Sequence, residues 1–141
     1  MPVTTVTGMG DRYSPWSHLA GLQHVTVQWS HLPAGLHGLT NGHTVRLAVT
    51  LMLVEATCAL AHELVHLEHG HDGHQDGRIE GRVRRITAHR LIPFDVLFDV
   101  FQWTQCPQEA ADELGVTERV LYDRLDTLTE QEKTTIRERM N

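Results

Sequence analysis

Residues 50–68 read TLMLVEATCALAHELVHLE and contain neither glycine nor proline. Apolar residues recur there at helical spacing, at Leu53, Leu60, Leu64 and Leu67. Apolar positions with this period lie on one side of a helix, and the lack of helix-breaking residues lets the helix continue. The sequence therefore predicts one long, largely buried helix over this segment.

This helix contains the motif HExxH, in which His62 and His66 are four residues apart. Residues at that spacing lie one turn above each other, so both imidazoles can point at the same metal ion. Glu63 projects about 100° further round the helix, where its carboxylate can accept a proton from water activated by the metal. Two histidines at this spacing also occur by chance on exposed helices, but the apolar neighbours of this motif favour a real site. We predict a Zn²⁺ site with His62 and His66 as ligands and Glu63 as the catalytic base.

Catalytic zinc usually has three protein ligands, so one more is expected after His66. Glu80 falls early on the next predicted helix, and a helix crossing the first one would bring its carboxylate to the metal. Asp72 is the main alternative, because metzincins have their third ligand six residues after the second histidine. That pattern requires glycine three residues after the second histidine, where this chain has His69. We favour Glu80. The other candidates of this segment are His69, His71, His74 and Asp76, and we expect the three histidines among them to lie in a solvated loop.

The residues before the long helix predict a small sheet. Residues 24–29 alternate apolar and polar side chains, which is typical of a half-buried strand. Residues 39–47 contain Asn41-Gly42, a pair that favours the positive φ angles of a hairpin turn. These segments indicate about three strands, which we expect to form an antiparallel sheet, preceded by a short helix near residues 18–22.

The residues after the long helix are predicted to be helical. A second helix covers residues 78–91 and ends before Pro93, and four more follow in the C-terminal segment; these are 94–103, 108–114, 118–128 and 130–139. Two of them resemble a helix-turn-helix, with Gly115 at the turn and Leu114 and Leu121 between the helices. Six acidic residues and two arginines give residues 107–128 a net charge of −4. Such a segment would be repelled by phosphates, so direct nucleic-acid binding is not expected.

Composition places these elements in one α+β domain. The chain has 141 residues, of which 40% are hydrophobic and 21% are charged, as in globular proteins. We divide it into a sheet region (11–50), the zinc-site helices (50–93) and a C-terminal helical segment (94–141). The net charge of −6 argues against a broad nucleic-acid surface, while eleven histidines support a metal site.

The sequence also bears on where the protein is found. Its first ten residues lack the basic start and apolar stretch of a signal peptide. The longest apolar run, residues 47–60, is interrupted by Glu55, which argues against a membrane span. Cys58 falls inside the predicted long helix and is expected to be a buried thiol rather than half of a disulfide. We expect a cytoplasmic protein.

The chain resembles the ImmA/IrrE family of metallo-endopeptidases over residues 11–139. The resemblance rests on residues 11–20 (DRYSPWSHLA), 60–70 (LAHELVHLEHG) and 80–93 (EGRVRRITAHRLIP). It implies a zincin-like core, with Glu80 as the third zinc ligand about a dozen residues before Pro93. The chain departs from the family at residues 81–83, Gly-Arg-Val, where further acidic and Ala-Asn residues are frequent.

The same resemblance implies a substrate. Members of this family cleave a helix-turn-helix repressor and thereby switch on a mobile element or a stress response. The alternatives are a DNA-binding or protein-binding regulator with a structural zinc ion, and a different zincin with Asp72 as ligand. The group that stabilises the oxyanion is left open between Tyr122, His89 and Arg84.

Overall fold

The computed structural model describes residues 12–71 and 75–140. This part of the chain has seven helices and one three-stranded sheet, in agreement with the predicted α+β class. The N-terminal half contains α2 (Pro15–Ala20), β1 (Thr26–Ser30), β2 (Gly38–Thr40), β3 (Thr44–Ala48) and α3 (Leu53–Glu68). The C-terminal half contains α4 (Gly77–Leu91), α5 (Phe94–Phe101), α6 (Pro107–Leu114), α7 (Glu118–Leu125) and α8 (Glu130–Met140).

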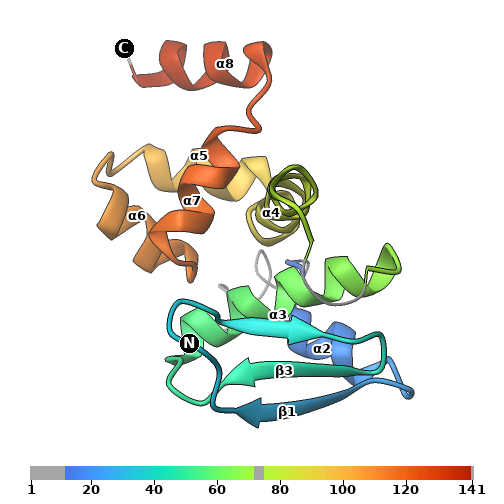
Figure 1. Cartoon of the computed structure of the whole chain (residues 1–141). Helices are drawn as coiled ribbons and strands as arrows, with labels where there is room; N and C mark the ends of the chain where they lie inside the picture. Colours follow the sequence, from blue (N-terminus) through green and yellow to red (C-terminus); the bar gives the residue numbers. More distant parts are fainter. Residues whose placement is uncertain (1–11, 72–74, 141) are drawn as a thin grey trace.

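The sheet has the strand order β1-β3-β2 (Figure 1). Strands β2 and β3 form the predicted antiparallel hairpin, in which the Asn41 side chain accepts hydrogen bonds from the backbone of His43 and Thr44. Gly42 takes the positive φ of 95° that its turn requires.

The prediction of a purely antiparallel sheet was wrong, because β1 pairs with β3 in parallel and the sheet is mixed. Residues 31–37 carry the chain across, so β1 lies along the edge of β3 that the hairpin leaves free. Alternation in residues 24–29 identifies which side chains share a face, and it carries no information about strand direction. Val27 lies opposite Val45 in this parallel register, which still directs both toward the core.

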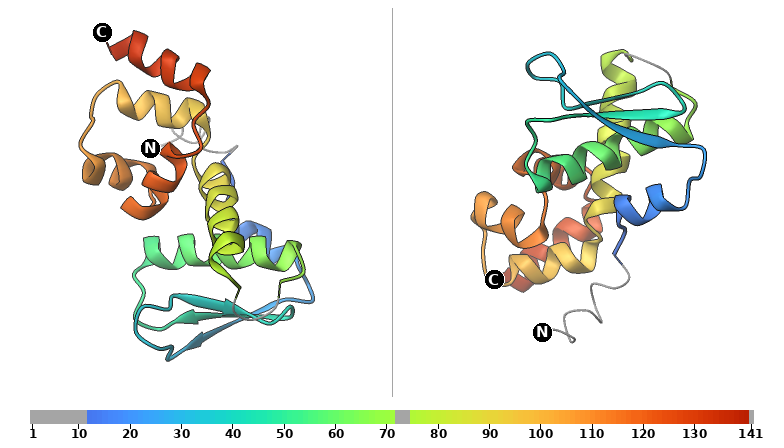
Figure 2. Two further views of the ribbon diagram at one scale, coloured as in Figure 1. Left: turned by 45° about the horizontal axis from the view of Figure 1, so that its top comes forward. Right: turned by 90° about the horizontal axis from the view of Figure 1, so that it is seen from below.

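Helix α3 lies between the sheet and the C-terminal helices (Figures 1 and 2). One face, with Leu60 and Leu64, packs against Val45 and Leu47 of β3. The opposite face, with Cys58 and Ala61, belongs to a second core formed with α5, α6 and α7. The central helix is therefore buried on two sides, which fixes the orientation of the side chains between them.

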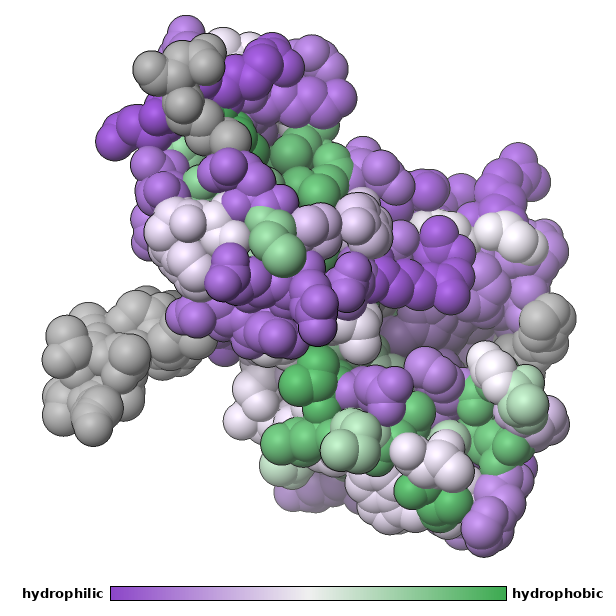
Figure 3. Space-filling view, turned by 90° about the vertical axis from the view of Figure 1, so that its left-hand side faces the viewer, coloured by the Kyte–Doolittle hydropathy of each residue, from purple (hydrophilic) through white to green (hydrophobic). Residues whose placement is uncertain are grey.

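The first turn of α3 differs from the prediction. The helix begins at Leu53, whose side chain is 74% exposed, and Met52 beside it is 73% exposed. Figure 3 shows many apolar side chains exposed over the sheet-containing half and a mostly polar surface, with a smaller apolar patch, over the C-terminal helices. Within α3, the first buried residue is Ala56.

The C-terminal helices form close to the predicted bounds. Gly115 ends α6 with a φ of 74°, and Thr117 then caps α7 by accepting a hydrogen bond from Val120 N. Leu114 and Leu121 are buried between these helices, as predicted. Among the described residues, none of the helices is both long and apolar enough to cross a membrane.

Candidate metal centre

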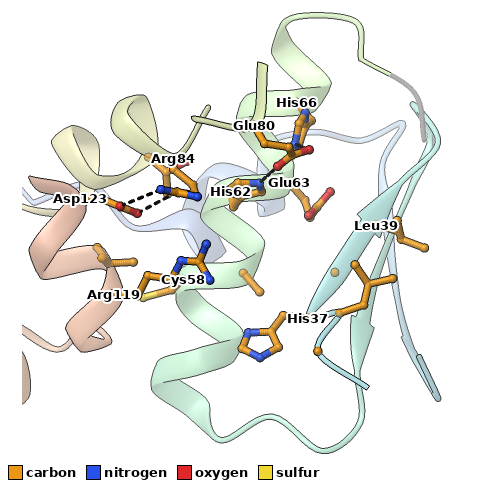
Figure 4. A pocket seen from close by; sticks show the side chains of 16 residues that line it. His37, Leu39, Cys58, His62, Glu63, His66, Glu80, Arg84, Arg119 and Asp123 are labelled. Carbon is orange, nitrogen blue, oxygen red and sulfur yellow. Dashed lines mark hydrogen bonds and ion pairs between the residues drawn. The ribbon is translucent and has the colours of Figure 1, made fainter. Parts of the chain in front are cut away.

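Three side chains converge where α4 crosses α3, and we call them the metal centre: His62, His66 and Glu80 (Figure 4). His62 Nε2 lies 2.9 Å from Glu80 Oε1, and His66 Nε2 lies 3.0 Å from Glu80 Oε2. One ligand atom from each residue lies within 4.8 Å of the other two. Ligands of a tetrahedral Zn²⁺ ion are about 3.3 Å apart, given bonds of about 2.0–2.1 Å, so this donor set fits zinc after small shifts.

The start of α4 places Glu80 in this group. Asp76 caps the helix, and its Oδ1 accepts a hydrogen bond from Ile79 N. Because Asp76 is used as the cap, Glu80 lies one turn into the helix, on the side that faces α3. Asp76, one of the candidate ligands, therefore has a structural role.

His66 is held from behind by a second histidine. Its Nε2 faces Glu80, while its Nδ1 lies 3.0 Å from His71 Nδ1. The chain reverses at Gly70, with a φ of 71°, and His71 N then bonds to His66 O. A partner on the second nitrogen fixes the ring of a metal-binding histidine. His71 lies in the loop after α3, as expected, but it is half-buried against His66, because the local turn at Gly70 brings it back onto the end of the helix.

His69 is not at the metal centre. His69 Nδ1 lies 2.9 Å from the backbone oxygen of Val65, and its residue is exposed at the end of α3. Asp72, the alternative third ligand, and His74 lie outside the described residues. The structure brings Glu80 to the two motif histidines, as the preferred prediction required.

Both motif histidines are in surroundings that favour the neutral, metal-binding form. Burial lowers the pKa of His62, and the hydrogen bond and negative charge of Glu80 oppose this effect. Burial likewise lowers the pKa of His66, again opposed by the charge of Glu80. Neutral imidazole nitrogens close to a carboxylate are a suitable donor set for Zn²⁺.

Glu63 lies beside the metal centre and is only 6% exposed. Burial, and after it the negative charge of Glu80, raises the pKa of Glu63 to about 8. A carboxyl with a pKa near neutrality can both accept and return a proton.

Gly38 on strand β2 makes room for Glu63, which sequence reasoning missed. A Cβ at Gly38 would lie 3.0 Å from Glu63 Cγ and 3.3 Å from Arg46 O. Any larger residue would therefore displace the Glu63 side chain. Nothing in the local sequence marks this glycine, since its φ is not in the left-handed region and the contact joins residues far apart in the chain.

A pocket of about 480 Å³ opens onto the metal centre and Glu63. Its walls come from residues 35–39, from α3, from α4 and from the first turns of α7. Arg84 of α4 lines it and forms an ion pair with Asp123 of α7, with Arg84 Nε 3.4 Å from Asp123 Oδ2. Tyr122 and His89, two candidates for oxyanion stabilisation, do not line this pocket, whereas Arg84 does.

The chain was compared with protein-family models, with curated proteins and with solved structures, and no match was found in any of the three comparisons. The resemblance to the ImmA/IrrE family thus stays a prediction from the quoted residues.

Proposed function

We propose that this protein is a zinc-dependent endopeptidase with a zincin-like core, related to the ImmA/IrrE family. The observation that supports it most is the convergence of His62, His66 and Glu80, with the Glu63 carboxyl beside them in one pocket. A structural zinc site usually has four protein ligands, whereas this group has three among the described residues and opens onto a pocket. That difference favours catalysis over a structural role.

In this proposal His62, His66 and Glu80 hold the zinc ion. Bound zinc acts as a Lewis acid that polarises a substrate carbonyl and makes water more acidic. Glu63 accepts the proton from the attacking water and returns it to the leaving nitrogen, and its shielded position favours both transfers. Gly38 keeps the space that the Glu63 side chain needs.

The pocket also suits an extended peptide. Strand β2 is at the edge of the sheet, and residues around it form one wall of the pocket. An exposed strand edge can pair with an additional strand through backbone hydrogen bonds. A peptide bound in this way would pass the metal centre with its backbone extended, as an endopeptidase requires.

We further propose that the substrate is a helix-turn-helix repressor, and that its cleavage relieves repression of a mobile element or a stress response. This part rests on the resemblance alone. The chemistry of the site is compatible with any flexible peptide segment, so the substrate must be found by experiment.

The test compares wild-type protein with Glu63→Gln and Glu80→Ala. We expect about one zinc per chain in wild type and in Glu63→Gln, measured by mass spectrometry of the metal, and little in Glu80→Ala. Cleavage is measured on a proteome-derived peptide library and on purified helix-turn-helix repressors encoded near the gene. Only wild type should cleave. Equal cleavage by Glu63→Gln would refute the mechanism, and a folded wild type without zinc would refute the metal site.

A DNA-binding regulator is the weaker alternative. Helix α7, the second helix of the helix-turn-helix-like pair, packs against α4, and its Arg119, Val120 and Asp123 line the pocket. A helix used in this way has less surface free for a DNA groove, and its segment carries a net charge of −4. Salt-sensitive binding of the DNA upstream of the gene in an electrophoretic shift assay would support this alternative.

A further inference from the structure

The pocket has a second charged wall, away from the metal centre. Helix α7 contributes Arg119, which is the second residue of that helix, and Asp123 one turn later. In Figure 4 the Arg119 guanidinium projects from α7 into the pocket, on the same side as the Arg84–Asp123 pair. Sequence reasoning gave Arg119 no role, because its position at the pocket depends on how α7 packs against α4.

Arg119 is the cation of this wall that has no acidic partner. The lining contains three carboxylates and two guanidinium groups. Asp123 is paired with Arg84, and both oxygens of Glu80 face the two histidines. In the described part of the chain, Arg119 forms neither an ion pair nor a hydrogen bond. Glu118, the acid next to it in sequence, is not among the lining residues.

Charge balance leads to the same residue. The charge of Glu80 would offset part of the charge of a bound Zn²⁺ ion, and Arg84 is paired with Asp123. Arg119 then adds one uncompensated positive charge to the pocket. Arg119 is itself exposed, so its guanidinium is accessible to an anionic group that enters the pocket.

We propose that Arg119 forms a carboxylate-binding subsite, which selects peptides with an aspartate or glutamate side chain close to the bond that is cleaved. This inference rests on the proposed peptidase function and narrows its substrate class. A planar guanidinium can hold a carboxylate through two parallel hydrogen bonds, a geometry that an amide or ammonium group does not reproduce. Arg84 is unable to take the same role while it is paired with Asp123.

The first experiment measures binding and needs no turnover. The probes are short peptide hydroxamates, whose hydroxamate group binds the zinc ion. One series carries Asp, Asn or Lys on one side of the hydroxamate, and a second series carries the same residues on the other side. Binding to zinc-loaded protein is measured by calorimetry for wild type, Arg119→Gln and Arg119→Glu. The matched control is Arg82→Gln, since Arg82 is an exposed arginine of α4 that does not line the pocket.

In at least one of the two probe series, wild type should bind the Asp probe about two- to fivefold more tightly than the Asn probe, the size expected of an ion pair at an exposed site. Arg119→Gln should lose this preference, Arg119→Glu should prefer the Lys probe, and Arg82→Gln should behave as wild type. Equal binding of Asp and Asn probes by wild type would overturn the subsite, as would a preference that survives Arg119→Gln.

A second measurement separates this inference from the proposed function. Wild type and Arg119→Gln are given the same peptide library, and the residues flanking each cut are counted. Enrichment of Asp and Glu that disappears in Arg119→Gln supports the subsite. Cleavage without enrichment refutes the subsite and leaves the peptidase intact. A uniform loss of kcat with unchanged preference would make Arg119 a transition-state group instead, and a protein that binds no zinc would refute both proposals.

Discussion

Arg124 and Glu63 are both ionisable side chains buried in this protein, yet their surroundings differ in kind. Arg124 is 1% exposed, and its Nε donates a 2.6 Å hydrogen bond to Ile92 O while Nη1 donates to Thr127 Oγ1. Glu63 is 6% exposed, and in the described part of the chain its carboxyl forms no hydrogen bond. The protein therefore supplies hydrogen-bond partners to the buried Arg124 guanidinium but, among the described residues, none to the Glu63 carboxyl.

The Arg124 group holds elements together. Its guanidinium binds the last backbone oxygen before Pro93 and so connects α7 to the end of α4. Arg12 does the same from the other end of the chain, because its Nη2 donates to Leu91 O and Leu114 O. Carbonyl oxygens at helix ends lack partners within the helix, and these two arginines supply them.

The metal centre has the opposite property. Glu63 and Glu80 are two carboxyls close together, and the charge of Glu80 contributes to raising the pKa of Glu63 to about 8. This arrangement lowers the stability of the protein, because burying a carboxyl without hydrogen-bond partners costs free energy. Polar groups that have no hydrogen-bond partner within the protein are free to bind a metal ion and a substrate. This property distinguishes a functional site from a structural one.

The largest expected effect is on catalysis. Glu63→Gln should lower the rate of peptide cleavage about a hundred- to ten-thousandfold, because it removes the group that transfers protons. Glu113→Gln is the control, since Glu113 is exposed on α6 and outside the pocket. Initial rates on one cleaved peptide measure the effect, and a loss under tenfold would mean that Glu63 is not the base.

Metal binding should be affected next. Glu80→Ala should weaken zinc affinity by more than about a hundredfold, because it removes a direct ligand. Asp76→Ala should instead lower stability by about 1 kcal/mol, since it removes only the cap of α4. Competition with a coloured chelator gives the affinity, and similar zinc loss in both variants would contradict the separate roles.

Arg124→Met tests the structural side of the comparison. It leaves the Ile92 carbonyl without its donor, so the free energy of unfolding should fall by about 1–3 kcal/mol. Arg119→Met, a change of the same size at an exposed site, should alter stability by about 0.5 kcal/mol or less. Urea unfolding measures both. Zinc content should stay at wild-type level in the folded Arg124→Met protein, and its loss would mean that Arg124 also supports the metal centre.

The smallest effect concerns pH. In metal-free protein the folded-state pKa of Glu63, about 8, lies above its ordinary value of 4.5, so folding retains a proton that the unfolded chain releases. Stability should therefore fall as pH rises, by about 1 kcal/mol between pH 7 and 8. Both histidines have lowered pKa values in the folded protein, so they add a smaller slope of the opposite sign, about 0.3 kcal/mol over this range. Urea unfolding with a chelator present should show the fall in stability for wild type, and Glu63→Gln should lose it.

Local sequence determined the elements whose structure depends on neighbouring residues. HExxH spacing places His62 and His66 one turn apart in any helix, Asn41-Gly42 favours a hairpin, and Pro93 ends the helix before it. Each effect operates over a few residues, through backbone dihedral angles and helical periodicity. Prediction of these features from sequence was correct for that reason.

Tertiary packing decided what depends on distant segments. The parallel direction of β1, the space at Gly38 and the projection of Arg119 into the pocket all come from contacts between separate elements. Glu80 was one of several candidates until the crossing of α4 over α3 brought it to the histidines. Local patterns give each helix and strand its faces, but which faces meet is set by burial of apolar surface across the whole chain.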